Sequence, residues 1–277
     1  MEMDSGYLKA GGICGVNYPV LLVHGIGSRD WKRFQYWGRI PARLAENGAR
    51  IYYGGQQSAV SVEQSGAELK ERILEVLAEA HVSKVNIIAH SKGGLDARYA
   101  ISCLGMAGHV ASLTTINTPH RGSALADALL EKASDKFAMT VGKGYNSLFA
   151  KLGDDQPDFL SAIHDLTEDR CRELNEKMPD RGGVYYQSVG SKMASKSSAP
   201  FPFGLSYGVI APIRGDNDGL VSVDSMEWGN FLGVLAPAGR KGICHVDMVD
   251  RLKRSIPGFD VCEFYIRLVR GLKEKGL

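Results

Sequence analysis

Residues 84–95 read KVNIIAHSKGGL, and this stretch decides the fold. Its first seven residues form a short run rich in Val and Ile, as expected of a strand that is buried inside a sheet. Ser91 follows at once, with Ala89 two positions before it and Gly93 two positions after it. Small residues at these positions permit a tight turn from strand to helix, and such a turn lifts the serine hydroxyl to the top of the sheet. Ser91 is therefore the candidate nucleophile.

Strand-like and helix-like segments alternate along the rest of the chain. Apolar or β-branched runs predict strands, and runs with apolar residues three or four positions apart predict helices. This alternation predicts one α/β domain over residues 1–277, with a mostly parallel central sheet and helices on both faces. Reactive groups of such sheets lie at the carboxyl ends of the strands. The predicted strands are 18–24, 49–53, 84–90, 110–117 and 183–190, and the predicted helices are 61–80, 95–104, 171–177 and 261–273.

Residues 122–165 interrupt the alternation. This segment lies between two predicted core strands and is several times longer than a typical connection. It has apolar residues at helical spacing, including Leu125 and Leu129. We expect an inserted lid or cap over the site; the alternative is a set of ordinary helices that cover the sheet.

Composition and charge exclude several classes of function. The chain has 33 basic and 31 acidic residues, so it lacks the strong positive field that nucleic-acid binding requires. Its apolar runs are strand-sized, whereas a membrane-spanning helix needs about 20 residues. Five scattered cysteines show no zinc or CxxC spacing. No signal peptide is visible, and these features together predict a cytoplasmic, metal-free protein with reduced thiols. Secretion stays an alternative if a leader has been removed.

A serine hydroxyl needs a neighbouring imidazole to remove its proton at neutral pH. In hydrolases built on this turn, an acid and then a histidine follow the serine along the chain. Of seven histidines, only His245, in GICHVDMVD, comes late enough to be this base. A solvent-facing loop histidine is the alternative interpretation.

The acid should lie in a loop between the serine and this histidine. Residues 215–221, GDNDGLV, form a polar turn flanked by glycines. We select Asp218 from this turn, with Asp216 as the runner-up. Asp224 is a weaker candidate, and the acidic pair at 154–155 is predicted to lie in a solvated loop.

Residues 24–27, HGIG, follow the first predicted strand. A glycine-bearing loop at this place can aim a backbone N–H at the oxygen that becomes negative when a carbonyl is attacked. We assign this donor to Ile26 and a second one to Lys92, in both cases through the backbone amide. No G-x-G-x-x-G or P-loop pattern is present, so no nucleotide cofactor is expected.

Several segments together resemble the α/β-hydrolase family and, within it, the bacterial triacylglycerol lipases and related esterases. They occur in the family's order and span roughly residues 18–250. The segments are PVLLVHGIG (19–27), AHSKGGLDARY (89–99), INTPHRGS (116–123), LTEDRCRELNEKMPDRGGVYYQSVG (166–190), NDGLVSVDS (217–225) and HVDMVD (245–250).

The resemblance implies roles for individual residues. It implies Ser91 as nucleophile, His245 as base and Asp218 as acid, because the family acid directly precedes the glycine of the NDG element. It also implies that the segment after INTPHRGS is a lid over an acyl-binding groove. The residues expected to contact an acyl chain are Leu125, Leu129 and Phe203, and Phe201, Leu205 and Tyr207 are further candidates.

Two features depart from the secreted relatives. Those proteins often bind calcium through an aspartate two residues after the histidine, which corresponds to Asp247 here. The companion carboxylate is not evident, because residues 191–198 offer Lys192 and Lys196 instead. Calcium requires several oxygen ligands, so we predict no calcium site and no cofactor. The disulfide of those relatives is not matched either.

These observations predict a serine-dependent carboxylic ester hydrolase that works through an acyl-enzyme. The expected partner is a small-molecule or lipid ester, with transient contact at a lipid interface. One alternative is an acyltransferase or thioesterase with the same three residues. Another is a non-catalytic binding protein with a hydrolase fold, since fold alone does not fix function.

Overall fold

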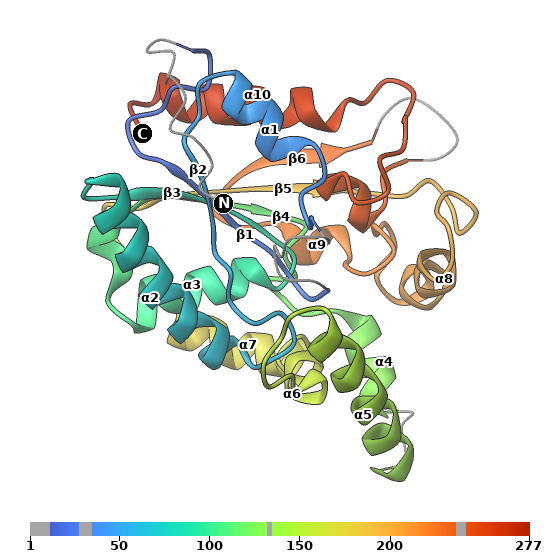
Figure 1. The fold of residues 1–277 in the computed structure, drawn as a ribbon. Coiled ribbons are helices and arrows are strands. Elements are labelled where there is room, and N and C mark those ends of the chain that lie inside the picture. Colours follow the sequence, from blue (N-terminus) through green and yellow to red (C-terminus); the bar gives the residue numbers. More distant parts are fainter. Residues whose placement is uncertain (1–11, 28–34, 132–134, 237–241) are drawn as a thin grey trace.

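The computed structural model describes residues 12–27, 35–131, 135–236 and 242–277, with residues 135–141 described by their backbone only. A six-stranded sheet with the order β2-β1-β3-β4-β5-β6 runs through the centre of the molecule (Figure 1). Every neighbouring pair of strands is parallel. The strands are β1 (Val20–Val23), β2 (Ile51–Tyr53), β3 (Val85–His90), β4 (Val110–Ile116), β5 (Tyr185–Ser191) and β6 (Asn230–Leu235).

The strand order changes direction between β1 and β3. The chain moves outward from β1 to β2 and then returns to add β3 on the other side of β1. The loops that leave the carboxyl ends of β1 and β3 therefore point apart and leave a crevice between them, where open α/β sheets bind ligands. The HGIG loop follows β1 and the Ser91 turn follows β3, so both predicted motifs lie at this point.

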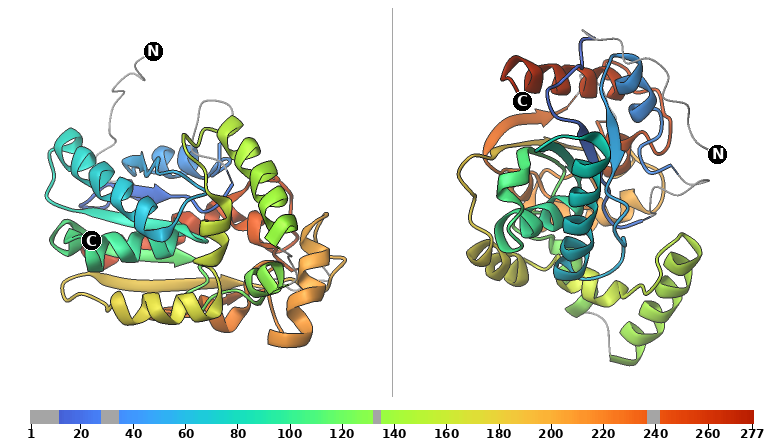
Figure 2. Two further views of the ribbon diagram at one scale, coloured as in Figure 1. Left: turned by 90° about the horizontal axis from the view of Figure 1, so that it is seen from below. Right: turned by 60° about the vertical axis from the view of Figure 1, so that its left-hand side comes forward.

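Helices cover both faces of the sheet, as the alternation predicts (Figures 1 and 2). Every residue of β1 is buried. Val20 and Leu22 pack in a hydrophobic cluster with side chains from the helices of one face. Leu21 and Val23 pack in a second hydrophobic cluster, with side chains from the helices of the other face. The first face is covered by α1 (Ile40–Glu46) and α10 (Val261–Glu274), and the second by α2 (Val62–Ala80), α3 (Gly93–Cys103) and α7 (Glu168–Lys177).

Three helices occupy the insertion between β4 and β5. They lie together at one end of the molecule, and α5 points away from the sheet (Figure 1). The described chain also contains two further α-helices and two 3-10 helices outside the insertion. The insertion consists of α4 (Ala124–Glu131), α5 (Asp135–Lys151) and α6 (Phe159–His164), and the other elements are α8 (Phe203–Arg214), α9 (Val223–Met226) and the 3-10 helices η1 (Met106–His109) and η2 (His245–Val249).

The α/β fold and the five predicted strands are confirmed, with bounds that differ by one or two residues. The sequence did not predict β6, α1 or α8. Strand β6 is an edge strand in which no residue is fully buried and Gly233 interrupts the apolar run. Helix α8 contains Pro212 and has only one buried residue, Ile210, so its amphipathic pattern is weak. Among helices in the described part of the chain, none combines the length and apolar character needed to cross a bilayer.

Candidate active site

Ser91 lies on a strained turn between β3 and α3. Its φ is +57°, in the left-handed region that residues other than glycine rarely adopt. The turn touches the loop after β1. A Cβ atom built on Gly25 would lie 2.6 Å from the Ser91 Cβ, and one built on Gly93 would lie 2.4 Å from the His24 carbonyl oxygen. Glycine at these two positions therefore lets the two predicted motifs meet.

His245 begins η2, directly after the Ile243–Cys244 segment, and only 3% of its surface is exposed. Its Nδ1 lies 2.6 Å from Asp218 Oδ2, and its backbone N–H donates to the Asp218 carbonyl oxygen at 2.9 Å. Ser91 and His245 line the same cavity. The structure thus brings the three predicted residues to one place, although they lie far apart in the sequence, and His245 is not a solvent-facing loop residue.

The Asp218 carboxylate is fully buried and accepts four hydrogen bonds. The backbone N–H groups of Leu220 and Val221 donate to Oδ1 at 2.9 and 2.8 Å. His245 Nδ1 and Asn117 Nδ2 lie 2.6 and 2.7 Å from Oδ2. Donors on both oxygens leave the carboxyl group little freedom to turn. Asp218 is therefore held in one orientation beside the imidazole.

The other candidate acids lie elsewhere. Asp216 is on the surface, where it pairs with Lys192 at 2.6 Å. Asp224 is 57% exposed and 4.0 Å from Arg214. The expectation of a solvated loop is wrong for Asp154, which is 4% exposed. Its carboxylate accepts three hydrogen bonds from residues 58–59, so it joins the insertion to the segment before α2.

The two predicted oxyanion donors lie at the ends of β1 and β3. Ile26 lines the cavity, one residue after the glycine that touches Ser91. Lys92 is the N-cap residue of α3. Backbone N–H groups at a helix start have no partner within the helix, and the helix dipole makes this end positive. The backbone N–H of Lys92 is thus suited to an anionic oxygen, and the role of the Ile26 amide stays a prediction.

A chain of hydrogen bonds connects the loop after β1 to the loop of His245. The Gly25 N–H donates to Tyr36 Oη at 3.1 Å. Tyr36 Oη lies 2.6 Å from His90 Nδ1, and His90 Nε2 lies 3.2 Å from the His245 carbonyl oxygen. Burial lowers the pKa of His90 well below its usual value, and the proximity of His245 adds to this. A neutral His90 that accepts from Tyr36 and donates to His245 fits this geometry.

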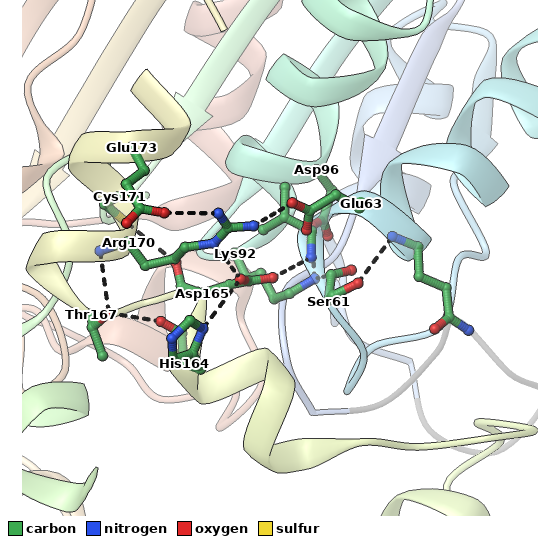
Figure 3. Close-up of polar contacts among 12 residues, drawn as sticks. Ser61, Glu63, Lys92, Asp96, His164, Asp165, Thr167, Arg170, Cys171 and Glu173 are labelled. Atoms are coloured by element: carbon green, nitrogen blue, oxygen red, sulfur yellow. Dashed lines mark hydrogen bonds and ion pairs between the residues drawn. The ribbon is translucent and has the colours of Figure 1, made fainter. Parts of the chain in front are cut away.

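The side chain of Lys92 lies beside Asp96 in a cluster of polar side chains (Figure 3). It is fully buried, and its Nζ lies 2.7 Å from Asp96 Oδ1 and 2.9 Å from Ser65 Oγ. Burial raises the pKa of Asp96 to about 7, although the charge of Lys92 opposes this. Nearby, Asp165 at the end of the insertion accepts the Val62 N–H at the start of α2. The nucleophile turn, α2 and the insertion therefore share one buried polar region.

A cavity of about 370 Å³ lies between the sheet and the inserted helices. Leu125, Leu129 and Phe203 line it, as predicted. Phe201 and Leu205 were also expected there, but they lie on the surface with 82% and 66% exposure. Three stacked rings from α5 and α6 form part of the wall: Tyr145, Phe149 and Phe159, with centroids 4.3–6.2 Å apart.

Asp247 has a basic partner. Arg254 Nε donates to its Oδ1 at 2.9 Å, and a second guanidinium nitrogen contacts Oδ2. The backbone N–H of Cys244 donates to the same Oδ2 at 2.9 Å. Within the described residues, no group of three or more His, Cys, Asp or Glu side chains is arranged to hold a metal ion. The Arg254 guanidinium thus pairs with the carboxylate that corresponds to the calcium-binding aspartate of the secreted relatives. The absence of a calcium site stays a prediction.

Sequence reasoning missed Tyr36, Asn117 and Arg254. Asn117 was quoted only within INTPHRGS, and His90 only within the serine motif. The contact partners of Tyr36 and Asn117 lie between 11 and 101 residues away in the chain, and the partner of Arg254 lies seven residues away. No local pattern indicates such contacts.

Comparisons with known proteins agree with this geometry. The family described as "Putative serine esterase (DUF676)" matches residues 20–163. A triacylglycerol lipase of Vibrio cholerae is 30% identical over 81% of this chain and 78% of that protein. A triacylglycerol lipase of Burkholderia plantarii is 36% identical over 66% of this chain. The chain spans about half the length of the first two curated relatives that it matches, 54% and 55%.

Solved structures support the same fold. The Staphylococcus hyicus lipase superposes with a TM-score of 0.73 at 16% identity, covering 94% of this chain and 98% of that one. A metagenomic carboxyl esterase superposes with a TM-score of 0.75 at 16% identity, covering 99% and 81%. With the matched family model and the Vibrio relative, these findings show that the chain belongs to the serine esterase family of α/β-hydrolases, alongside bacterial triacylglycerol lipases.

Proposed function

We propose that this chain hydrolyses carboxylic esters with Ser91, His245 and Asp218 as its catalytic triad. The observation that supports this most directly is the 2.6 Å contact between His245 Nδ1 and the buried Asp218 carboxylate, at a cavity that Ser91 also lines. Asp218 fixes the tautomer in which Nδ1 bears the proton, so that Nε2 is the basic nitrogen. An imidazole held this way is suited to activate a serine hydroxyl.

The reaction proceeds in two halves. In the first, Ser91 Oγ attacks the ester carbonyl while His245 accepts its proton, and the amides of Ile26 and Lys92 stabilise the oxyanion. The imidazolium then protonates the leaving alcohol as the C–O bond breaks, which leaves an acyl-enzyme. In the second, His245 takes a proton from water, the resulting hydroxide attacks the acyl carbon, and Ser91 leaves with that proton.

The substrates are proposed to be lipid esters with an apolar acyl group. The cavity wall consists largely of Leu, Ile, Val and Phe side chains. Burial of apolar surface contributes about 25 cal/mol per Å² to binding. Leu129, Tyr145 and Leu148 on α4 and α5 are 43–50% exposed, and such side chains are suited to contact a lipid interface. The insertion, residues 122–165, would then act as a cap over the acyl group.

Replacing the nucleophile tests the reaction. Ser91→Ala should lower kcat on p-nitrophenyl esters by at least about 10³-fold. Ser206→Ala, at a half-buried serine of α8, is the matched control and should keep normal turnover. A fluorophosphonate adduct mapped to Ser91 by mass spectrometry is the second expected result. Near-normal activity of Ser91→Ala, or labelling at another residue, would refute the assignment.

Product analysis separates hydrolysis from acyl transfer. Acid should be the main product in water, and the yield of new ester with added alcohol should follow ordinary competition with water. An excess of new ester or a strong preference for acyl-CoA would favour the acyltransferase or thioesterase alternative. A steep preference for acetate over longer acyl groups would contradict the lipid substrate.

A further inference from the structure

Asn117 is an unusual residue beside the acid. It follows β4, is fully buried and has a φ of +49°. Its Nδ2 donates to Asp218 Oδ2 and to Ser191 Oγ, both at 2.7 Å. Its Oδ1 is buried and has no hydrogen-bond partner among the described residues. Its backbone N–H donates to the Val189 carbonyl oxygen at 3.0 Å, so the residue is fixed between β4 and β5.

This arrangement is unfavourable for the fold alone. Asparagine tolerates the left-handed region better than most residues other than glycine, but glycine adopts it more readily still. A buried oxygen without a donor has lost its hydrogen bonds to water and gained none in return. Glycine at this position would avoid both penalties. Backbone strain and unsatisfied buried groups occur preferentially where a side chain has a functional task.

The orientation of the amide follows from chemistry. An ionised carboxylate can only accept hydrogen bonds, so the nitrogen of the Asn117 amide must face Asp218. The second proton on this nitrogen reaches Ser191 Oγ, whose own hydroxyl is 3.4 Å from the Ile243 carbonyl oxygen. Both amide protons are thus used, and the side chain has one favoured orientation.

We propose that Asn117 is a positioning residue that orients the Asp218 carboxylate toward His245 and moderates its negative charge. The proposal rests on the proposed function of the triad. Asn117 and His245 share one oxygen, Oδ2, so the amide holds that oxygen in place and takes up part of its hydrogen-bonding capacity. Without the amide, the carboxylate would attract the His245 proton more strongly and favour the imidazolium. The imidazole would then lose its function as a base at a higher pH.

Other charged and titratable groups surround His245 and stay unchanged when Asn117 is replaced. They include a neutral imidazole whose ring centroid lies 4.5 Å from that of His245, two ion pairs, and a further cation at the cavity. These groups are His90 on β3, the pairs Asp247–Arg254 and Asp250–Arg39, and Arg251.

Asn117→Gly tests the proposal without straining the backbone, because glycine adopts positive φ readily. We expect the acidic limb of the kcat/KM profile to move up by about 0.5–1 pH unit, as loss of one hydrogen bond to a charged group implies. Activity should fall several-fold below the midpoint of the limb and change less than two-fold on the alkaline plateau. KM should stay within two-fold of the parent. Asn230→Gly, at an exposed asparagine at the start of β6, is the matched control, with a limb that moves by less than 0.2 pH unit.

A spectroscopic measurement gives a readout that does not need turnover. In the Ser91→Ala background, the Nδ1 proton of His245 should give a downfield proton resonance, and Asn117→Gly should move it further downfield. An unchanged resonance and an unchanged acidic limb would overturn the proposal, even if the melting temperature falls. An equal shift in Asn230→Gly would overturn it too. Failure of the proposed function would look different, because Ser91→Ala alone would then retain ester hydrolysis.

Discussion

At the scale of single residues, two aspartates of one short loop have opposite surroundings. Asp218 is fully buried under four hydrogen bonds, whereas Asp216, two positions earlier, forms an exposed ion pair with Lys192. Exposed ion pairs contribute at most about 1 kcal/mol to stability. The direction in which the loop turns its side chains therefore decides which carboxylate can act on His245.

Asp218→Asn should lower kcat by about 10⁴-fold while the fold is kept, since an amide in this position favours the wrong histidine tautomer. Asp216→Asn is the matched control and should stay within two-fold of the parent. Steady-state kinetics on a short p-nitrophenyl ester measure both. Similar losses in the two variants would show that the acid assignment is wrong.

Tyr36→Phe should lower kcat about ten-fold with little change in KM. The hydroxyl group accepts the Gly25 N–H and contacts His90, so its removal loosens the loop that bears Ile26. Complete loss of one oxyanion donor costs about 2.7–4 kcal/mol of transition-state stabilisation. A loosened loop should lose only part of this stabilisation. Tyr207→Phe, on α8, is the comparison variant. A larger effect on KM than on kcat would contradict the positioning role.

The sequence was sufficient to propose three reacting residues that the structure brings together, but not to identify the residues that contact them. Serine, acid and histidine occur in short motifs whose order along the chain restricts the choice. The side chains of Asn117 and Tyr36 meet their partners in other loops only once the sheet has formed. A tyrosine or an asparagine in a loop has many ordinary reasons to be there, so its role is visible only from its contacts.

At the scale of elements, two ion pairs hold η2, the short helix that begins with His245. Asp247 pairs with Arg254, and Asp250 at the end of η2 pairs with Arg39 before α1. Both carboxylates are nearly fully buried. The position of the histidine thus depends on two guanidinium groups from different parts of the chain.

Arg254→Met should destabilise the protein by about 1–3 kcal/mol, because the Asp247 carboxylate stays buried without its charged partner. Urea unfolding measures this difference. Arg270→Met on α10 disrupts an exposed pair and should change stability by less than about 1 kcal/mol. Activity of the parent should not change when EDTA is added, and an EDTA-dependent loss would overturn the prediction that the chain has no calcium site.

Asp250 should make stability depend on pH in a defined direction. Burial alone would raise its pKa, but the hydrogen bonds and charge of Arg39 outweigh burial, so the pKa lies below its usual value. The folded state therefore binds this proton less readily than the unfolded state does, and the stabilisation is present above about pH 4. It should disappear as pH falls through the lowered pKa.

The difference in unfolding free energy between the parent and Asp250→Asn measures this effect. It should be about 1–3 kcal/mol at pH 6 and should approach zero as the pH falls through the lowered pKa of Asp250. A difference that grows as the pH falls would have the wrong sign and would contradict the ion-pair explanation.

Prediction from sequence also worked unevenly at this scale. Strands β1, β3 and β4 are buried throughout, so runs rich in apolar or β-branched residues identify them. The edge strand β6 alternates exposed and half-buried residues around Gly233, which weakens its pattern. Packing against β5, and not local preference, makes this segment a strand.

At the scale of the whole molecule, the return segment of the insertion is fixed to the body. Asp154 accepts three hydrogen bonds from residues 58–59, and the Asp158 N–H donates to the Ala59 carbonyl oxygen at 2.6 Å. Farther along, Asp165 binds the first turn of α2. The wall formed by α6 is therefore anchored to the same part of the molecule that holds Lys92.

Asp154→Ala should loosen this anchor and leave the triad intact. We expect faster amide hydrogen exchange in residues 153–160 and a KM that rises more for long-chain than for short-chain esters. The exposed neighbour Asp155 supplies the control Asp155→Ala, with exchange close to the parent. A uniform loss of kcat for all chain lengths would indicate that the anchor affects the triad instead of the cavity.

The anchoring of the insertion has a practical consequence for engineering. Ser123 at its start binds the Leu220 carbonyl oxygen and Asp154 fixes its return, so α4 and α5 connect two points that the body itself defines. If the segment between these two points were replaced by the corresponding segment of a relative, the same contacts of Ser123 and Asp154 would attach it to the body. The preference for acyl length should then change with the exchanged segment, while Ser91, His245 and Asp218 stay as they are.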